Sequence, residues 1–218
     1  MHTVAIVHAS RASIDPVTNY YNQTAPEIRT INQLDDGVMG YLAALDTRRA
    51  VRLLGEMIEK GRTEYGAKVA LLTCSAVSRA SMAELRAATS IPIVKIDEPM
   101  ARRATAAGRR IGIVATFPAT VATTVELLHE ASTIPIETTH VLAAEALQAL
   151  LKGRMEEHDR LLLQAADRVA ADRIDALVLA QVSMARLENL IRERVRVPVF
   201  SSLATSLDEV RALLTQAR

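Results

Sequence analysis

The sequence predicts an α/β fold built from two similar lobes, each a mostly parallel sheet flanked by helices. Three observations lead to this prediction. Short runs of apolar and β-branched residues recur along the 218 residues and show little alternation, which is typical of strands buried on both faces of a parallel sheet. Segments with apolar residues at helical spacing separate these runs. The two halves of the chain also match each other at a nearly constant offset.

The individual elements follow from these patterns. The expected strands are Val4–His8, Val69–Thr73, Ile93–Ile96, Ile111–Ala115, Ile136–Val141, Ala176–Ala180 and Val197–Phe200, with Arg29–Gln33 as a weaker candidate. The expected helices are Asp46–Lys60, Val121–Glu130, Ala143–Lys152, His158–Ala171 and Arg186–Arg194, with further helices after Ser75 and near the C-terminus. Residues 9–23 are polar without a clear period, so we expect a loop there, of the kind that carries ligand contacts in α/β proteins.

The internal repeat defines the two lobes. Val4–Ser10 aligns with Ile111–Phe117, and Val69–Cys74 aligns with Ala176–Gln181, with the same shift in numbering for both segments. We expect residues 1–97 and 199–218 to form the first lobe, which carries Cys74, and residues 98–198 to form the second, which carries Gln181. Because parallel sheets bind ligands at the carboxyl ends of their strands, these two residues are expected to face one cleft.

Composition excludes several classes of protein. Lys and Arg number 26 against 25 for Asp and Glu, so nothing in the charge favours binding to nucleic acid or to an anionic membrane. A single cysteine permits neither an internal disulfide nor a cysteine-rich zinc site. No apolar run approaches the roughly 18 residues that span a bilayer, and the N-terminus resembles a strand and not a signal peptide. We expect a cytoplasmic protein.

Cofactor motifs are also missing from the sequence. No strand is followed by Gly-x-Gly-x-x-Gly, and no Gly-Lys-Ser/Thr phosphate loop is present. No pair of histidines has the spacing of metal ligands together with further partners. We therefore expect neither a nucleotide cofactor nor a metal.

Cys74 is the candidate for chemistry. It follows a buried strand and precedes an expected helix, where free backbone N–H groups would lower the pKa of the thiol. The alternative is a buried structural cysteine, since an unpaired cysteine is among the most buried residue types. The polar neighbours Thr73 and Ser75 and the position at a strand end favour the reactive role.

Several motifs carry a family resemblance. They are Thr73-Cys74-Ser75, the segment Gly112–Val121, the segment Leu179–Ala185 and the final strand with its turn, Val197–Ser202. With these, the chain resembles the aspartate/glutamate/hydantoin racemase superfamily, which includes maleate isomerase and arylmalonate decarboxylase. The resemblance implies two pseudo-symmetric Rossmann-like lobes with the site between them, a small carboxylic acid as substrate, no cofactor and a homo-oligomer.

Gln181 is the main departure from that family. It stands where the resemblance implies a second cysteine, and an amide can donate and accept hydrogen bonds but cannot carry a proton between faces of a substrate. A symmetric racemisation by two thiols is therefore excluded. We expect Gln181 to orient the substrate, and His8, at the end of the first strand, is a candidate acid because its ordinary pKa lies near 6.5. The alternative for His8 is a histidine satisfied by backbone groups.

The remaining site residues are assigned to substrate binding. Thr116 is either a carboxylate ligand or a helix cap, and the two roles are compatible at a helix N-terminus. The expected substrate-binding residues are Ser10, Thr73, Ser75, Ala76, Thr116, Phe117, Thr120, Val182 and Ser183. Pro118 suits the first turn of a helix, and Ser206–Glu209 fits a capping box at the start of the last helix.

The leading functional hypothesis is a cofactor-independent racemase-like isomerase that acts on a small carboxylic acid, with Cys74 as thiolate base or nucleophile. One alternative is a one-cysteine lyase, decarboxylase or cis–trans isomerase of the same superfamily. Another is a binding protein that senses a small acid without turning it over.

Overall fold

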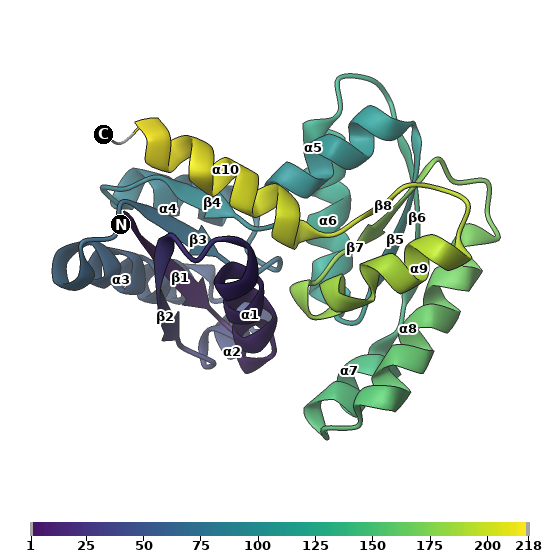
Figure 1. The fold of residues 1–218 in the computed structure, drawn as a ribbon, viewed down its shortest axis with the longest axis horizontal. Helices are drawn as coiled ribbons and strands as arrows, with labels where there is room; N and C mark the ends of the chain where they lie inside the picture. Colours follow the sequence, from purple (N-terminus) through teal and green to yellow (C-terminus); the bar gives the residue numbers. More distant parts are fainter. Residues whose placement is uncertain (1, 217–218) are drawn as a thin grey trace. The chain divides into compact units, whose positions relative to one another are not determined.

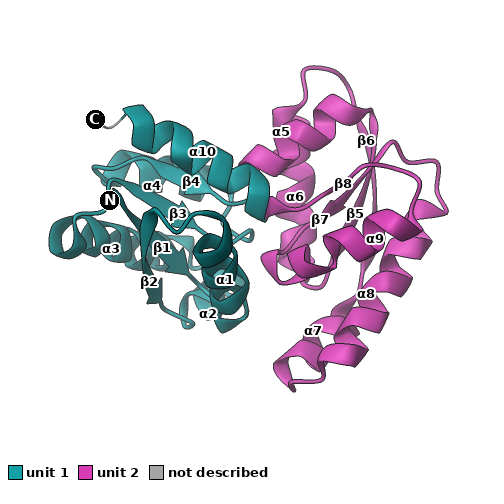
Figure 2. Cartoon of the chain, viewed as in Figure 1, with its two compact units in different colours: residues 1–96, 203–218 teal, residues 97–202 magenta. Residues whose placement is uncertain are grey.

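A computed structural model describes residues 2–216, which divide into two compact units. Unit 1 holds residues 2–96 and 203–216, and unit 2 holds residues 97–202 (Figure 2). The boundary after the second lobe differs from the expected one, because 199–202 belong to unit 2. The reason is strand pairing: β8 (Val199–Phe200) bonds to β7 (Ala176–Leu179), so the last strand stays with the second sheet.

Unit 1 is a parallel sheet in the order β2-β1-β3-β4 (Figure 1). Its elements are β1 (His2–His8), η1 (Arg11–Ser13), α1 (Ile14–Thr24), β2 (Ile28–Leu34), α2 (Val38–Ala43), α3 (Thr47–Tyr65), β3 (Val69–Leu72), α4 (Arg79–Ala88), β4 (Ile93–Lys95) and α10 (Ser202–Gln216).

Helices cover both faces of the unit 1 sheet. Ala5 and Val7 of β1 join a core with Leu54 and Ile58 of α3 and Leu85 of α4. Alternate residues of β1 point to the other face, where Figure 2 shows α1 and α10. Every side chain of β1 from Val4 to Val7 is fully buried, which explains why these strands read as continuous apolar runs.

Unit 2 is a second parallel sheet in the order β6-β5-β7-β8. Its elements are α5 (Glu98–Ala107), β5 (Arg110–Ala115), α6 (Pro118–Ala131), β6 (Glu137–Leu142), α7 (Ala144–Leu151), α8 (Met155–Ala170), β7 (Ala176–Leu179), η2 (Val182–Leu187), α9 (Glu188–Arg194) and β8. Residues of α8 and α9 pack on one face of this sheet, and residues of α5 and α6 pack on the other.

The two sheets repeat each other in register. Val4 pairs with Val69 between β1 and β3, and their counterparts in the sequence repeat, Ile111 and Ala176, pair between β5 and β7. The strand order is also the same in both sheets. The duplication expected from the sequence is therefore present in the pairing of the strands.

In each unit a helix packs closely against the first strand of the sheet, and the small residue that permits this contact lies on a different element in each. In unit 1 the small residue lies on the helix: a Cβ built on Gly61 of α3 would lie 2.5 Å from the Cβ of Ala5. In unit 2 it lies on the strand: a Cβ on Gly112 of β5 would lie 2.3 Å from Cγ1 of Val169 in α8. Ala5 and Gly112 occupy matching places in the repeat. Each contact needs one residue without a bulky side chain for the helix to approach the strand.

The predicted loop at residues 9–23 is wrong, because most of this segment forms η1 and α1. Only Val17 and Tyr21 of α1 are buried, and they lie one helical turn apart. Two apolar residues are too sparse to display a helical period, while the polar remainder faces outward. The expected helix Arg186–Arg194 is also divided, into η2 and the shorter α9.

The capping box expected at Ser206–Glu209 is wrong as well. α10 already begins at Ser202, so Ser206 lies inside the helix and its Oγ donates to the carbonyl of Leu203. Among residues 2–216, no helix is long and apolar enough to cross a lipid bilayer.

Candidate active site

The carboxyl edge of the unit 1 sheet brings His8, Thr73 and Cys74 into one region. β1 and β3 are parallel neighbours in which Val7 pairs with Leu72, so both strands end at the same edge. The backbone N–H of Thr73 donates to the carbonyl of Val7 at 3.0 Å, which continues the ladder past β3. Cys74 follows directly, so the thiol is positioned by the end of a fully buried strand.

His8 is held by three side chains. Its Nδ1 lies 2.8 Å from Oγ of Ser13 and 3.2 Å from Oγ1 of Thr73, and its Nε2 lies 2.9 Å from Oδ1 of Asn32. An amide oxygen only accepts, so Nε2 carries the proton in the neutral ring, and Nδ1 accepts from a hydroxyl. The alternative expectation for His8 was hydrogen bonding to backbone groups, whereas its partners in the structure are side chains.

Burial sets the charge of His8. The side chain is fully buried, and this desolvation lowers the pKa of His8 below its ordinary 6.5, with the Asn32 hydrogen bond opposing the shift. A lowered pKa favours the neutral ring at neutral pH. His8 is thereby better suited to hold the Thr73 hydroxyl beside Cys74 than to donate a proton.

Cys74 is 7% exposed, and its Sγ lies 3.8 Å from Sδ of Met39 in α2. The expected helix N-terminus at Cys74 is wrong. α4 begins at Arg79 and is capped by Ser78, whose Oγ accepts from the N–H of Ser81. Residues 75–78, with a turn at Ser75 and Ala76, separate the thiol from the helix, so the free amides of α4 do not explain an activated thiolate here.

A buried cation lies near the thiol segment. Lys95, at the end of β4, is 3% exposed, and its Nζ donates to the carbonyl oxygen of Ser75 at 3.4 Å. The ammonium therefore sits beside the residue that follows Cys74. Of the other expected ligands in unit 1, Ser75 is buried and Ala76 is half-buried, while Ser10 caps η1 by accepting from the N–H of Ala12.

The carboxyl edge of the unit 2 sheet joins Thr116 to Gln181. Thr116 follows β5 and Gln181 follows β7, and Val114 pairs with Leu179 between these strands. Oε1 of Gln181 accepts from the backbone N–H of Thr116 at 2.6 Å and from its Oγ1 at 2.9 Å. Thr116 is 2% exposed and Gln181 is half-buried. We call this pair of hydrogen bonds the Thr116–Gln181 clasp.

The other site residues expected in the second lobe flank this clasp. Phe117 is the N-cap residue of α6 and makes no side-chain cap, with Pro118 in the first turn as predicted. The alternative of a cap by Thr116 is wrong, since Phe117 occupies that position and the Thr116 hydroxyl bonds to Gln181. Thr120 and Val182 are buried, and Ser183 is half-buried in η2.

Four residues of this region are not among the site residues expected from the sequence: Ser13, Asn32, Met39 and Lys95. Ser13 was hidden in the segment expected to be a loop. Asn32 lies on the edge strand β2 that was only a weak candidate, and it reaches His8 because β1 and β2 pair. Lys95 carried a signal, because a lysine that ends an apolar strand is unusual.

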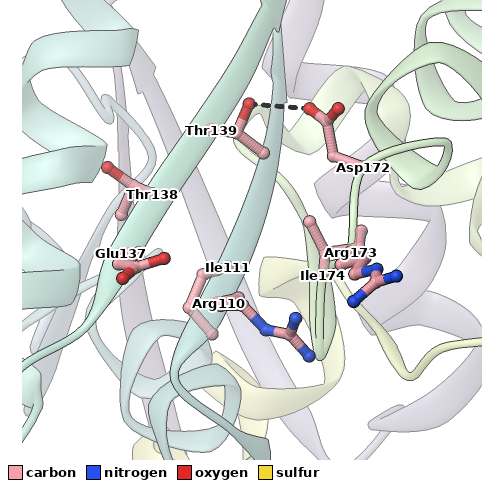
Figure 3. A pocket seen from close by; sticks show the side chains of 8 residues that line it. All are labelled: Arg110, Ile111, Glu137, Thr138, Thr139, Asp172, Arg173 and Ile174. Carbon is pink, nitrogen blue, oxygen red and sulfur yellow. Dashed lines mark hydrogen bonds between the residues drawn. The ribbon is translucent and has the colours of Figure 1, made fainter.

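A hollow of about 350 Å³ lies at the opposite, amino-terminal edge of unit 2 (Figure 3). Arg110, Glu137 and Arg173 line it, and Thr139 donates to Asp172 at 3.1 Å. It is lined by starts of strands and so is separate from Thr116 and Gln181. Within residues 2–216, no three His, Cys, Asp or Glu side chains gather in a way that suits a metal ion.

Solved structures share this fold. The chain is similar to allantoin racemase from Klebsiella pneumoniae, with 18% identity, a TM-score of 0.76, and coverage of 99% of this chain and 89% of that one. Glutamate racemase from Francisella tularensis in complex with D-glutamate gives 14% identity, a TM-score of 0.77 and coverage of 99% and 81%. An aspartate racemase homologue from Pyrococcus horikoshii gives 15%, 0.71, and 100% and 99%.

Sequence comparison identifies the family. No curated protein is similar enough in sequence to be matched. The sequence model of one family, described as Asp/Glu/Hydantoin racemase, matches residues 5–210, which is nearly the whole chain. The chain therefore belongs to the Asp/Glu/hydantoin racemase family, which places it among the isomerases.

Proposed function

We propose that this protein is a cofactor-independent, racemase-like isomerase that acts on a small carboxylic acid or related compound, with Cys74 as the thiolate base. The observation that carries the proposal is the position of Cys74 in a member of this family. The chain's one cysteine lies just past the end of β3, after Thr73, at the carboxyl edge of a parallel sheet, where such sheets bind ligands. The position of Lys95 also supports the proposal, because its Nζ donates to the carbonyl oxygen of Ser75, the residue that follows Cys74.

The proposed step is a proton transfer. The thiolate takes the α-proton of the substrate, and the electron pair of the broken C–H bond moves into the adjacent carbonyl or carboxyl group. The resulting S–H group then returns a proton to the same carbon. Return from the same sulfur restores the original configuration with hydrogen exchange, and inversion requires a second acid on the other face.

We propose substrate contacts at the carboxyl edge of the sheet in each unit taken by itself. In unit 1, Ser10, Thr73, Ser75 and Ala76 are the proposed contacts. In unit 2 the proposed contacts lie around the clasp, at Phe117, Thr120, Val182 and Ser183. We further propose that the protein acts in the cytoplasm as a homo-oligomer, and light scattering coupled to size-exclusion chromatography measures its mass.

A second candidate function is a one-cysteine lyase or decarboxylase, and Gln181 favours it. An amide replaces the second thiol that a symmetric racemase needs. In decarboxylation the C–C bond to the leaving carboxylate breaks and carbon dioxide departs. The electron pair moves into the remaining carboxyl group, and the Cys74 S–H group protonates the carbon. This reaction needs one proton donor on one face.

The experiment that tests both candidates is proton NMR in D2O. The substrates are D- and L-aspartate, D- and L-glutamate, allantoin, maleate and an arylmalonate. Cys74→Ser removes the thiol, and Thr63→Ser, on the exposed face of α3, is the matched control. We expect α-proton exchange or turnover with at least one compound, abolished by Cys74→Ser and retained by Thr63→Ser.

Each outcome assigns a reaction. Exchange with loss of optical activity supports racemisation, and exchange with retained configuration supports a one-base site. Loss of carbon dioxide supports the decarboxylase, and conversion of maleate to fumarate supports the cis–trans isomerase. Turnover that survives Cys74→Ser contradicts the proposed role of the thiol. Binding without any turnover supports the alternative of a small-acid binding protein.

A further inference from the structure

We infer that Gln181 presents its amide group to the substrate as a fixed, neutral hydrogen-bond donor, and that Thr116 is the positioning residue that orients it. This inference rests on the proposed function, since it assigns how the carboxyl edge of the unit 2 sheet meets the substrate. It also restricts the ligand: the group that meets Gln181 is a carboxylate or carbonyl oxygen, and not an ammonium or another N–H donor.

The orientation of the amide follows from what a backbone N–H can do. It can only donate, so the Gln181 atom that lies 2.6 Å from the N of Thr116 must be the oxygen. The hydroxyl of Thr116 donates to the same oxygen at 2.9 Å. Two donors therefore hold Oε1, and a flipped amide would set two donors against each other. The end of the side chain that remains for a ligand is the Nε2 amide, with two N–H donors.

Burial decides which of the two residues a ligand meets. Thr116 is 2% exposed and both of its donors are engaged, whereas Gln181 is half-buried. A substrate oxygen that bound Thr116 directly would have to displace Oε1 and leave it without partners. The substrate would gain the two hydrogen bonds that Gln181 loses, and the Gln181 amide would be left half-buried without its partners, so the exchange brings no net gain. Contact through Nε2 keeps the clasp intact.

The backbone around Gln181 also restrains its side chain. The residue lies just past the end of the buried strand β7, after Ala180, and its carbonyl accepts from the N–H of Met184 at 3.0 Å as η2 begins. A donor held in place before the substrate arrives needs little reorganisation when charge develops on a substrate oxygen. The clasp is thus suited to stabilise the oxygen that receives the electron pair of the broken bond.

The repeat shows that the clasp belongs to unit 2. In the register that matches β1 with β5 and β3 with β7, Thr116 corresponds to Ala9 and Gln181 corresponds to Cys74. Ala9 has no hydroxyl, so the equivalent side-chain bond is impossible in unit 1. One edge of the protein therefore offers a thiol and the matching edge offers an oriented amide.

The direct test is NMR on ¹⁵N-labelled protein. The side-chain NH2 pair of Gln181 is assigned by its loss in Gln181→Glu, and the backbone N–H of Thr116 reports on the clasp. D-aspartate, L-aspartate, malonate and allantoin are added in turn. We expect the Gln181 NH2 pair to shift with at least one of them while the Thr116 N–H keeps its slow hydrogen exchange. Faster exchange at Thr116 on ligand addition would mean displacement of Gln181 and would overturn the inference. So would a Gln181 NH2 pair that stays unmoved by all four compounds.

Variants of Thr116 and Gln181 distinguish a role in positioning the amide from a role in folding alone, and the quantity measured is the affinity for the probes. Thr116→Val removes the hydroxyl, and we expect about a threefold to tenfold loss of probe affinity, the usual effect of one hydrogen bond. Thr116→Ser restores the hydroxyl and should stay within about twofold of the unmodified protein. Gln181→Glu should weaken binding of the anionic probes by more than about tenfold, and of uncharged allantoin by less, because it adds a negative charge. Equal losses for charged and uncharged probes would contradict the donor role.

Failure of the inference and failure of the proposed function give different results. D2O exchange is recorded on the same samples. Exchange that proceeds while the Gln181 signals stay unmoved overturns the inference alone. Shifts at Gln181 without exchange or turnover support the amide donor and contradict the enzyme.

Discussion

Replacing Gly112 by Ala should destabilise unit 2, because β5 and α8 approach too closely to admit a side chain there. The new Cβ would lie 2.3 Å from Cγ1 of Val169 and 2.8 Å from Cδ1 of Ile174. Carbon atoms in contact normally lie about 3.5–4.0 Å apart, so the overlap with Val169 exceeds roughly 1 Å. Val169 is 1% exposed and belongs to the buried core of unit 2.

The expected loss follows from two opposing effects. Overpacking a buried site costs about 1–3 kcal/mol, and an overlap of this size belongs at the upper end. Alanine also restricts the unfolded chain relative to glycine, which returns about 0.4–1 kcal/mol. We therefore expect Gly112→Ala to lower the free energy of unfolding by about 2 kcal/mol.

The assay is urea unfolding followed by far-ultraviolet circular dichroism. Gly40→Ala is the matched control: Gly40 lies in α2 and a Cβ there meets nothing within 4 Å. The same substitution should stabilise that helix by about 0.5–1 kcal/mol. The second control is the double variant Gly112→Ala/Val169→Ala, in which the clashing Cγ1 is gone.

The double variant gives the decisive comparison. Val169→Ala alone leaves a cavity and should be destabilising by about 2 kcal/mol. The alanine at position 112 partly fills that cavity, so the double variant should be more stable than the sum of the two single losses by roughly 2 kcal/mol. A single variant within about 0.5 kcal/mol of the unmodified protein, or additive losses in the double variant, would refute the reasoning.

Two further predictions concern buried polar groups. Burial lowers the pKa of His8, so at a pH between the folded pKa and 6.5 the unfolded chain binds more protons than the folded protein. The contribution of neutral His8 to the free energy of unfolding is therefore full above pH 6.5 and is lost as the pH falls through the folded pKa. Urea midpoints between pH 5 and pH 8 should show this fall, and His8→Gln should make it shallower; an unchanged slope contradicts the assignment. Tyr21→Phe should leave the thermal midpoint unchanged or raise it, because the Tyr21 hydroxyl is buried without a hydrogen-bond partner among the described residues. A loss above about 1 kcal/mol in that variant would reveal a partner for the hydroxyl.

The sheets were predictable from the sequence because burial on both faces leaves a simple signal. Strands such as Val4–His8 and Ala176–Ala180 are continuous apolar runs, and each corresponds to a strand of the structure. The constant offset found in the sequence reappears in the pairing of Val4 with Val69 and of Ile111 with Ala176. A strand buried on both faces needs apolar residues at consecutive positions, and a duplication copies whole segments of sequence. Both features are therefore visible in the sequence without knowledge of distant contacts.

The surroundings of the candidate site were less predictable, because they depend on contacts between distant residues. The helix α1 was missed since only Val17 and Tyr21 face the core. The sequence predicts a helix directly after Cys74 because it does not reveal the turn at residues 75–76 or the start of α4 at Arg79. The partners of His8 come from Ser13, Asn32 and Thr73 on three different segments. The Thr116–Gln181 clasp likewise joins residues 65 positions apart.

Gly61 on the helix of unit 1 and Gly112 on the strand of unit 2 limit how the two halves of this chain can be recombined. A chimera that moved α8 alone onto the unit 1 sheet would set the bulk of Val169 against Ala5, where even a single added carbon lies at 2.5 Å. Moving α3 alone onto the unit 2 sheet would set Gly61 against Gly112 and leave a void. Helix and strand are therefore interchangeable between the halves only as a matched couple.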